Sequence, residues 1–203
     1  MKHRITAALV AAVLALTMAG AAFAVEEPSP PEDGEVVRVI DVIDGDTIRV
    51  EWPDGWWERV RYIGIDTPEI GHDPGEADEP WGREATEVNA DLVDGRDVLL
   101  EFDVSDTDRY DRLLRYVWVE SGGDWVMANG ELVARGLADV RAYEPDTKHD
   151  AWFRQLQDEA RAAGLGMYGD GDADDGDAGD GDTGDEAAEP GLLERFLDLI
   201  DGD

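Results

Sequence analysis

Cysteine is absent from the 203-residue chain, and its absence excludes several classes of protein at once. No disulfide can staple the fold, and no lipidated cysteine can tether the protein to a membrane. Thiolate zinc sites and cysteine nucleophiles are excluded as well.

Lysine is almost absent too, since only Lys2 and Lys148 occur beside fifteen arginines. The fifty acidic residues give a formal net charge of -33 and a pI near 4.1. Residues 169–203 hold fourteen acids and one arginine, and the first 24 residues hold two cations, so the remaining 144 residues carry a net -22. A domain with that charge repels itself at low ionic strength.

This composition resembles that of the acidic, lysine-poor proteins of extreme halophiles, where molar salt limits charge interactions to about 3 Å. An ordinary acidic secreted protein is the alternative. Because the acidity is spread over the whole domain rather than confined to a tail, we expect a protein adapted to high salt.

No apolar run in the sequence reaches the roughly 20 residues that a membrane-spanning helix needs. The longest such run, at residues 5–19, follows the basic residues Lys2 and Arg4 and precedes an Ala22-Phe23-Ala24 cleavage motif. Residues 1–24 are therefore predicted to be a secretory signal peptide, cleaved near Ala24, rather than a membrane anchor. We expect the mature protein to be secreted, extracellular and monomeric, without stable insertion in a membrane.

Four further segments follow the leader. Residues 25–34 form an acidic, proline-rich spacer, and residues 35–168 carry the apolar periodicity of a folded domain. Residues 169–189 repeat glycine and aspartate and are predicted to be a disordered acidic tail. Residues 190–203 are predicted to form a short amphipathic helix that docks on this domain or on an unknown partner. Its apolar stripe comprises Leu192, Leu193, Phe196, Leu197 and Ile200.

Alternating β-branched and aromatic residues predict five strands, at residues 36–43, 47–52, 56–65, 98–102 and 113–119. Apolar residues at helical spacing, each run followed by a glycine, predict three helices, at residues 81–93, 126–135 and from about 147 to 163. Asp146 or Thr147 is expected to cap the last helix. This order predicts an α+β fold, a five-stranded OB-type β-barrel with about three helices. A small β-sandwich offers no place for the first helix.

Acidic residues gather where the predicted strands end. Asp44 and Asp46 lie between the first two strands, and Asp66 and Glu69 follow the third. Two carboxylates, a backbone carbonyl and waters suffice to bind Ca²⁺. Acids in turns are also ordinary in so acidic a chain, so no single one of them carries the prediction.

Three arginines are expected to lie near these acids. Arg61 lies in the third strand, and Arg109 and Arg112 precede the fifth. Guanidinium groups bind phosphate oxygens through several fixed donors, although surface salt bridges are the simpler role. Acids that bind a metal together with arginines that bind phosphate indicate phosphodiester chemistry.

Five short pieces of the domain, in one order and at compatible spacings, resemble the staphylococcal nuclease (thermonuclease) family. They lie at residues 42–48, 61–69, 81–85, 108–112 and 129–133. The resemblance extends over about residues 36–168 and implies an OB-fold nuclease that uses Ca²⁺ to hydrolyse DNA and RNA.

The resemblance also implies roles for individual residues. The metal carboxylates correspond to Asp46 and Asp66, the carbonyl ligand corresponds to Thr67, and Asp44 corresponds to an acid that acts through the metal's water shell. Glu69 corresponds to the residue that orients or deprotonates the attacking water. The remaining matches are the phosphate-binding Arg61 and Arg112 and the pocket aromatics Tyr110 and Tyr143.

The chain departs from the family pattern at several positions. Asp111 stands where glycine is usual, and Arg141 stands where a second pocket tyrosine is found. The lysines that lie near the nucleotide are missing, and Arg109 is expected to substitute for one of them. None of these departures removes a catalytic group.

Two other classes compete with the nuclease hypothesis. A non-catalytic OB-type module that binds nucleic acid or protein would be expected to lose these carboxylates and arginines. An envelope protein that binds Ca²⁺ or a surface through acidity alone would need neither Arg61 nor Arg112. Both DNA and RNA remain candidate substrates.

The charge of the domain generates a prediction about salt. Phosphate contacts ordinarily weaken as salt rises, because binding releases counterions. Here molar salt also screens the repulsion between the acidic domain and a polyanionic substrate. We expect nuclease activity, measured on DNA or RNA at increasing NaCl or KCl, to rise from low salt towards molar salt. A maximum near 0.1 M followed by inactivation at 2 M would contradict adaptation to high salt.

Overall fold

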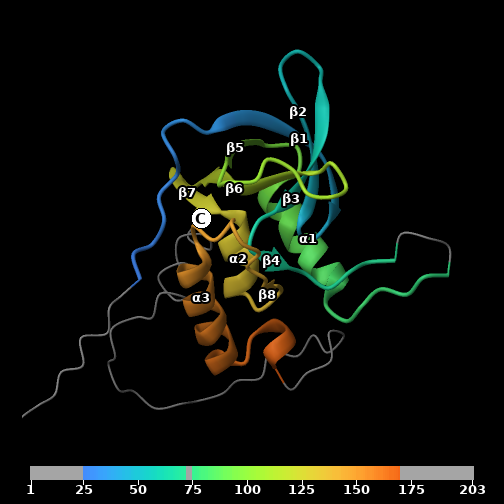
Figure 1. The fold of residues 1–203 in the computed structure, drawn as a ribbon. Helices are drawn as coiled ribbons and strands as arrows, with labels where there is room; N and C mark the ends of the chain where they lie inside the picture. The colour runs from blue at the N-terminus through green and yellow to red at the C-terminus, as the bar shows by residue number, and fades with distance from the viewer. Residues whose placement is uncertain (1–24, 72–74, 170–203) are drawn as a thin grey trace, which may run out of the picture.

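The computed structural model describes residues 25–71 and 75–169 (Figure 1). The predicted signal peptide, the acidic tail beyond Gly169 and the predicted C-terminal helix lie outside the described residues. Among the described helices, none combines the length and apolar character that a membrane crossing requires.

Five strands form a closed barrel. They are β1 (Glu35–Asp44), β2 (Thr47–Glu51), β3 (Trp57–Tyr62), β5 (Asp97–Glu101) and β6 (Leu113–Ser121). Neighbouring strands pair antiparallel in the order β3-β2-β1-β5-β6, and a parallel pairing of β3 with β6 closes the ring. With the helices described below, this architecture confirms the predicted five-stranded OB barrel.

Three short strands were not predicted. They are β4 (Ile65–Asp66), β7 (Asp124–Met127) and β8 (Asp139–Val140). Gly64, at φ 81°, breaks the predicted third strand, so that its last residues leave the barrel and pair with β8 instead. The predicted helix at 126–135 begins two residues late, because Val126 and Met127 pair with β6 across the Gly122-Gly123 turn.

Three α-helices pack against the barrel. They are α1 (Gly82–Val93), α2 (Ala128–Ala134) and α3 (Asp150–Ala163), followed by the 3₁₀ turn η1 (Gly166–Tyr168). Every residue of α2 is buried, because this helix lies between the barrel and α3 (Figure 1). Gly130 makes this close packing possible, since a Cβ there would overlap the ring of Trp152 on α3.

The predicted cap of α3 is wrong. His149 occupies the N-cap position without a side-chain cap hydrogen bond. Asp146 instead accepts hydrogen bonds from the backbone N–H groups of Val104 and Ser105, at 2.9 and 2.7 Å. Because the Asp146 carboxylate binds these two backbone N–H groups, which are distant in sequence, it does not cap the nearby start of α3.

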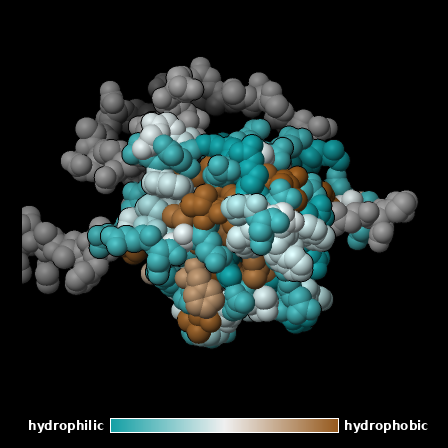
Figure 2. All heavy atoms as spheres, turned by 90° about the horizontal axis from the view of Figure 1, so that it is seen from above, coloured by the Kyte–Doolittle hydropathy of each residue, from teal (hydrophilic) through white to brown (hydrophobic). Residues whose placement is uncertain are grey.

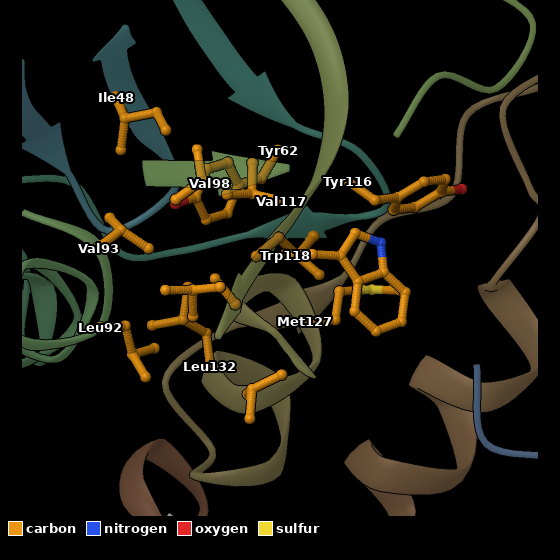
Figure 3. Packing of buried hydrophobic residues seen from close by; sticks show 14 of the residues in the cluster. Ile48, Tyr62, Leu92, Val93, Val98, Tyr116, Val117, Trp118, Met127 and Leu132 are labelled. Carbon is orange, nitrogen blue, oxygen red and sulfur yellow. The ribbon is translucent and has the colours of Figure 1, made fainter. Parts of the chain in front are cut away.

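The core fills the space between the barrel and the helices (Figure 3). Alternate strand residues point inward, such as Val37 and Val39 of β1, whereas Val36 stays exposed. Trp118 of β6 and Met127 of β7 belong to the same core, together with apolar side chains of α1 and α2 (Figure 3).

Glu101 is a buried acid at the end of β5. Its carboxylate accepts hydrogen bonds from Trp118 Nε1 at 2.7 Å and from the Lys148 ammonium, and lies 3.1 Å from His149 Nε2. Burial raises the pKa of Glu101, but the hydrogen bonds from His149, Lys148 and Trp118 outweigh it and lower the pKa below 4.5. The charged carboxylate therefore ties the end of the barrel to the start of α3.

Replacing this carboxylate should destabilise the fold in a pH-dependent way. We expect Glu101→Gln to lower the free energy of unfolding at pH 7 by about 2 kcal/mol, since charge-assisted hydrogen bonds are lost. The folded pKa lies below the unfolded one, so this stabilisation is complete above pH 4.5 and disappears as the pH falls through the folded pKa. Denaturant unfolding at pH 7 and at acid pH measures it, with the exposed Glu87→Gln as control. An equal difference at both pH values would contradict this account.

Candidate active site

The turn between β1 and β2 brings two buried acids to one end of the barrel. Asp44 accepts a hydrogen bond from the Asp46 backbone N–H at 3.1 Å, and Asp46 accepts one from the Thr47 hydroxyl at 3.1 Å. Between the two acids, a Cβ at Gly45 would lie 2.7 Å from Thr67 Oγ1 and 2.9 Å from Ala85 Cβ. Glycine therefore lets this turn press against the segment that follows β4.

Asn89 of α1 supports the same turn, and the sequence analysis missed it. Its side chain is fully buried, donates to the Asp44 carbonyl at 3.0 Å and accepts a hydrogen bond from the Tyr62 hydroxyl at 2.8 Å. One signal was available, because Asn89 interrupts the apolar stripe of its helix at a core position. A buried amide needs polar partners, and here they are the acidic turn and β3.

Arg61 joins the two acidic segments. Its guanidinium contacts Asp46 Oδ2 at 2.5 Å through Nη1 and Asp66 Oδ1 at 2.8 Å through Nη2. The Thr67 backbone N–H donates to the same Asp46 oxygen at 2.9 Å. The side chains of Arg61 and Asp46 are 15% and 4% exposed, so this ion pair is shielded from bulk water, whereas the Asp66 side chain is 41% exposed. The structure thus brings together Asp46, Arg61 and the turn at 66–67.

The carboxylates at this end of the barrel outnumber its nearby cations. Burial raises the pKa of Asp46 to about 7, against the opposing effect of Arg61 and with a further increase from Asp44. Burial also raises the pKa of Glu69, and Asp44, Asp66 and Glu79 add to the increase. In both cases burial is the largest cause and the neighbouring carboxylates add to it, so the charged form of each acid is less favourable than in water.

Glu69 follows the acidic turn and lines the cleft described below. Two backbone contacts hold its position: its N–H donates to the Glu79 carboxylate at 3.1 Å, and its carbonyl accepts from the Glu79 N–H at 2.8 Å. Its carbonyl oxygen would also lie 2.5 Å from a Cβ at Gly82, so the start of α1 packs closely against it. The Glu69 side chain itself remains accessible to solvent.

The turn at 108–112 presents Arg112 to the site. Asp108 accepts hydrogen bonds from the backbone N–H groups of Tyr110 and Arg112, at 2.8 and 3.0 Å. Its second oxygen accepts from Arg112 Nε at 2.8 Å and Nη2 at 2.7 Å. Asp108 therefore fixes both the turn and the guanidinium, a role that the sequence analysis did not assign.

Asp111 replaces the expected glycine and adopts the conformation that glycine would favour. Its φ is 60°, in the left-handed region that aspartate tolerates better than most residues. Asp111 is exposed, while Arg112 pairs with Asp108. This departure thus preserves the backbone of the turn.

An open cleft of about 630 Å³ collects most of the predicted residues. Its lining includes Arg61, Asp66, Glu69, Arg109, Tyr110, Arg112 and Tyr143. Tyr110 and Tyr143 are 55% and 70% exposed. The guanidinium carbons of Arg109 and Arg112 lie 4.6 and 5.6 Å from the centre of the Tyr110 ring, so Tyr143 offers the freer ring face to a ligand. Asp44, Asp46 and Thr67 lie buried behind Arg61 rather than in the cleft wall.

Arg141 also lines the cleft, with its Nε 3.7 Å from Asp66 Oδ2. It therefore adds a cation beside the acidic turn, where the family pattern has an aromatic ring. Asp66 consequently lies between two guanidinium groups, those of Arg61 and Arg141.

The donor set suits a hard cation. Asp46 and Asp66 supply carboxylate oxygens, and the neighbouring Thr67 supplies a backbone carbonyl, which are the ligand types that Ca²⁺ prefers. Within residues 25–71 and 75–169, no three histidine or acidic side chains converge into a complete metal site. The two carboxylates agree with a site that would be completed by backbone, water or substrate oxygens.

Comparison with known proteins gives consistent likenesses. Residues 59–170 match the family model described as staphylococcal nuclease homologue. The chain is 39% identical over 135 residues to a thermonuclease of Staphylococcus intermedius, spanning 66% of this chain and 77% of that protein. It is 38% identical over 127 residues to a thermonuclease of Staphylococcus hyicus, spanning 63% and 72%. It is also 40% identical over 128 residues to the endonuclease YncB of Bacillus subtilis, spanning 62% and 58%.

The geometry of the 108–112 turn generates a prediction about anion binding. Asp108→Ala should weaken the binding of a nucleoside monophosphate about tenfold, because Arg112 loses the charge-assisted hydrogen bonds that orient it. Calorimetric titration of the folded variant measures the effect. Asp106→Ala is the matched control, since it breaks an Asp–Arg pair with Arg115 outside the cleft. Unchanged or tighter binding by Asp108→Ala would show that Asp108 only neutralises Arg112.

Proposed function

Because this chain belongs to the staphylococcal nuclease family, we propose that it is a secreted, Ca²⁺-dependent member that works at high salt. The chain is a nuclease, a hydrolase of phosphodiester bonds, as its relatives named thermonuclease and endonuclease indicate. One observation carries the proposal for its mechanism: Arg61 joins Asp46 and Asp66 at a cleft that also contains Arg112 and Glu69.

The two arginines bind the scissile phosphate. Attack on a phosphodiester builds negative charge on its equatorial oxygens, and fixed guanidinium donors stabilise that charge best. Asp108 holds Arg112, and Asp46 and Asp66 hold Arg61, so both guanidinium groups are positioned at the cleft before the substrate arrives.

Glu69 orients the attacking water and accepts its proton. Its side chain lines the cleft and is accessible to solvent, while its backbone is held by Glu79 and packed against Gly82. Burial and the nearby acids raise the pKa of Glu69, which makes its carboxylate a stronger base than an isolated one. General-base catalysis of this kind contributes about 10²–10⁴-fold.

Asp46, Asp66 and the Thr67 carbonyl would hold Ca²⁺, with Asp44 acting through a bound water. The support for this proposal is the oxygen donor set and the excess of carboxylates over cations. When bound, the ion polarises the phosphate and offsets the charge of the carboxylates. In the structure, the Arg61 guanidinium and the Thr67 backbone N–H bridge the two acidic segments.

The outer part of the cleft binds the nucleotide. Tyr143 exposes a ring face on which a base can stack. Tyr110 carries Arg109 over its ring, with 4.6 Å from the guanidinium carbon to the ring centre, and adds a cation to this part of the cleft. At the position of Arg141, where an aromatic ring was expected to stack on the base, the cleft has a positive charge instead. The substrate class that fits is single-stranded DNA or RNA, whose bases are free to stack.

Secretion and work at high salt rest on the composition. The signal peptide motif in residues 1–24 supports export, and a net -22 on the domain between leader and tail supports function in molar salt. Several arginines of the domain each pair with one carboxylate, as Arg38 does with Asp97 and Arg154 with Asp150, and the remaining carboxylates give the surface its negative charge.

Chelation and one substitution test the calcium-dependent mechanism. We expect a chelator to abolish cleavage of single-stranded DNA and RNA, and added Ca²⁺ to restore it. Glu69→Gln keeps the shape of the side chain but removes the base, so kcat should fall about 10²-fold or more. Nucleotide binding should survive in this variant. The exposed Glu87→Gln on α1 is the matched control and should cleave like the parent.

Two results would contradict the proposal. A folded parent protein in high salt with Ca²⁺ that leaves both substrates intact would indicate a non-catalytic binding module. Full cleavage in the presence of chelator would remove Ca²⁺ from the mechanism while leaving the nuclease assignment in place.

A further inference from the structure

The outward face of β3 leads from the cleft to an exposed tryptophan. Along this strand Val60 and Tyr62 point into the core, whereas Trp57, Arg59 and Arg61 lie on the opposite face. The distance from Arg61 to Trp57 along the strand is about 14 Å. An arginine of the active site thus begins a row of side chains that ends at the tip of the β2–β3 hairpin, which projects from the barrel (Figure 1).

Trp57 is exposed, and one neighbouring side chain packs against its ring. The guanidinium carbon of Arg49 on β2 lies 5.3 Å from the centre of its ring, and Asp41 holds this guanidinium at 2.7 Å. Arg49 is also the register partner of Arg59, directly across the β2–β3 ladder. The ring of Trp57 is 53% exposed, so it leaves surface free for another planar group.

Arg59 and Arg109 flank Tyr110 between this strand and the cleft. Arg59 donates to the Tyr110 carbonyl at 3.3 Å, and Arg109 donates to the Tyr110 hydroxyl at 2.6 Å. Within the described part of the chain, neither arginine forms an ion pair with a carboxylate. In a protein with fifty acids and seventeen basic residues, two neighbouring cations without a carboxylate partner stand out.

We propose that these residues form a further binding site for the substrate strand, which begins at the rim of the cleft and continues along β3. The site, here called the β3 stripe, comprises Arg49, Trp57, Arg59, Arg109 and Tyr110. It binds the part of a single-stranded polynucleotide that extends beyond the nucleotide in the cleft. Arg59 and Arg109 contact its phosphates, and one base stacks on Trp57. This inference rests on the proposed function and adds to it a preference for longer single strands.

The chemistry of the stripe favours this ligand over others. Alternating cations and exposed rings suit a strand in which phosphates and bases alternate, and base stacking tolerates any sequence. A duplex would hide its bases from Trp57. Seen from the end that carries the hairpin, the surface is mixed, with hydrophilic groups around several hydrophobic ones (Figure 2). The exposed Glu51 lies opposite Trp57 and closes the stripe at the hairpin tip.

Binding of uncleaved oligonucleotides tests this site directly. Labelled (dT)12, (rU)12 and (dT)2 are titrated with the protein in the presence of chelator, at a fixed salt concentration at which circular dichroism shows a folded protein. We expect Trp57→Ala to weaken binding of both 12-mers about tenfold and to change binding of (dT)2 less than twofold. Arg59→Ala should weaken 12-mer binding and reduce the slope of log affinity against log salt by about one.

Two control variants match these changes elsewhere on the surface. Trp125→Ala removes an exposed tryptophan from β7, and Arg154→Ala removes an exposed arginine from α3. Both should bind the 12-mers like the parent. A Trp57→Ala protein that binds the 12-mers like the parent, or that loses affinity for (dT)2 equally, overturns the inference.

The outcomes separate this inference from the proposed function. If the parent cleaves nucleic acid but Trp57→Ala leaves 12-mer affinity unchanged, the β3 stripe is refuted and the nuclease is not. If the parent cleaves nothing yet binds the 12-mers through Trp57, the catalytic proposal fails and the β3 stripe stands as a binding site.

Discussion

The double ion pair of Arg61 with Asp46 and Asp66 is the interaction on which the rest of the site depends. Asp44, Asp46 and Asp66 come from two separate turns, and their charges would drive these turns apart if no cation lay between them. Gly45 and the backbone of Thr67 complete the contact between the turns, and Asn89 holds the first turn through the Asp44 carbonyl. Breaking one partner of so shielded a pair leaves a buried charge without compensation, which is costly.

Much of this arrangement could be predicted from local patterns. Strand alternation in residues 35–51 and the polar turn between Asp44 and Asp46 each have a local cause, and they indicated both the barrel and the acids. The parallel pairing of β3 with β6 joins segments about fifty residues apart, so no local pattern predicts it. The closed barrel was predicted from the order of strands and helices along the chain. The role of Asn89 was hidden because its partners, Tyr62 and the Asp44 carbonyl, are distant in sequence.

The misplaced features have the same origin. Asp146 has the residue type and position of a helix cap, but tertiary contacts with Val104 and Ser105 compete for its carboxylate. Val126 and Met127 suit a helix as well as a strand, and pairing with β6 decides between them. The net charge, by contrast, needed no tertiary information, because the composition alone predicted an acidic surface. The structure was needed to show which arginines pair with carboxylates and that, among the described residues, Arg59 and Arg109 do not.

The central claim is that the acids around Arg61 form a site for one Ca²⁺ ion. Its most direct measurement is calorimetric Ca²⁺ titration in 1 M NaCl, where the acidic surface binds divalent ions only weakly because its charges are screened. The account predicts one ion per parent chain and none per Asp46→Asn chain, with both proteins folded. Equal stoichiometry for the parent and Asp46→Asn would contradict it.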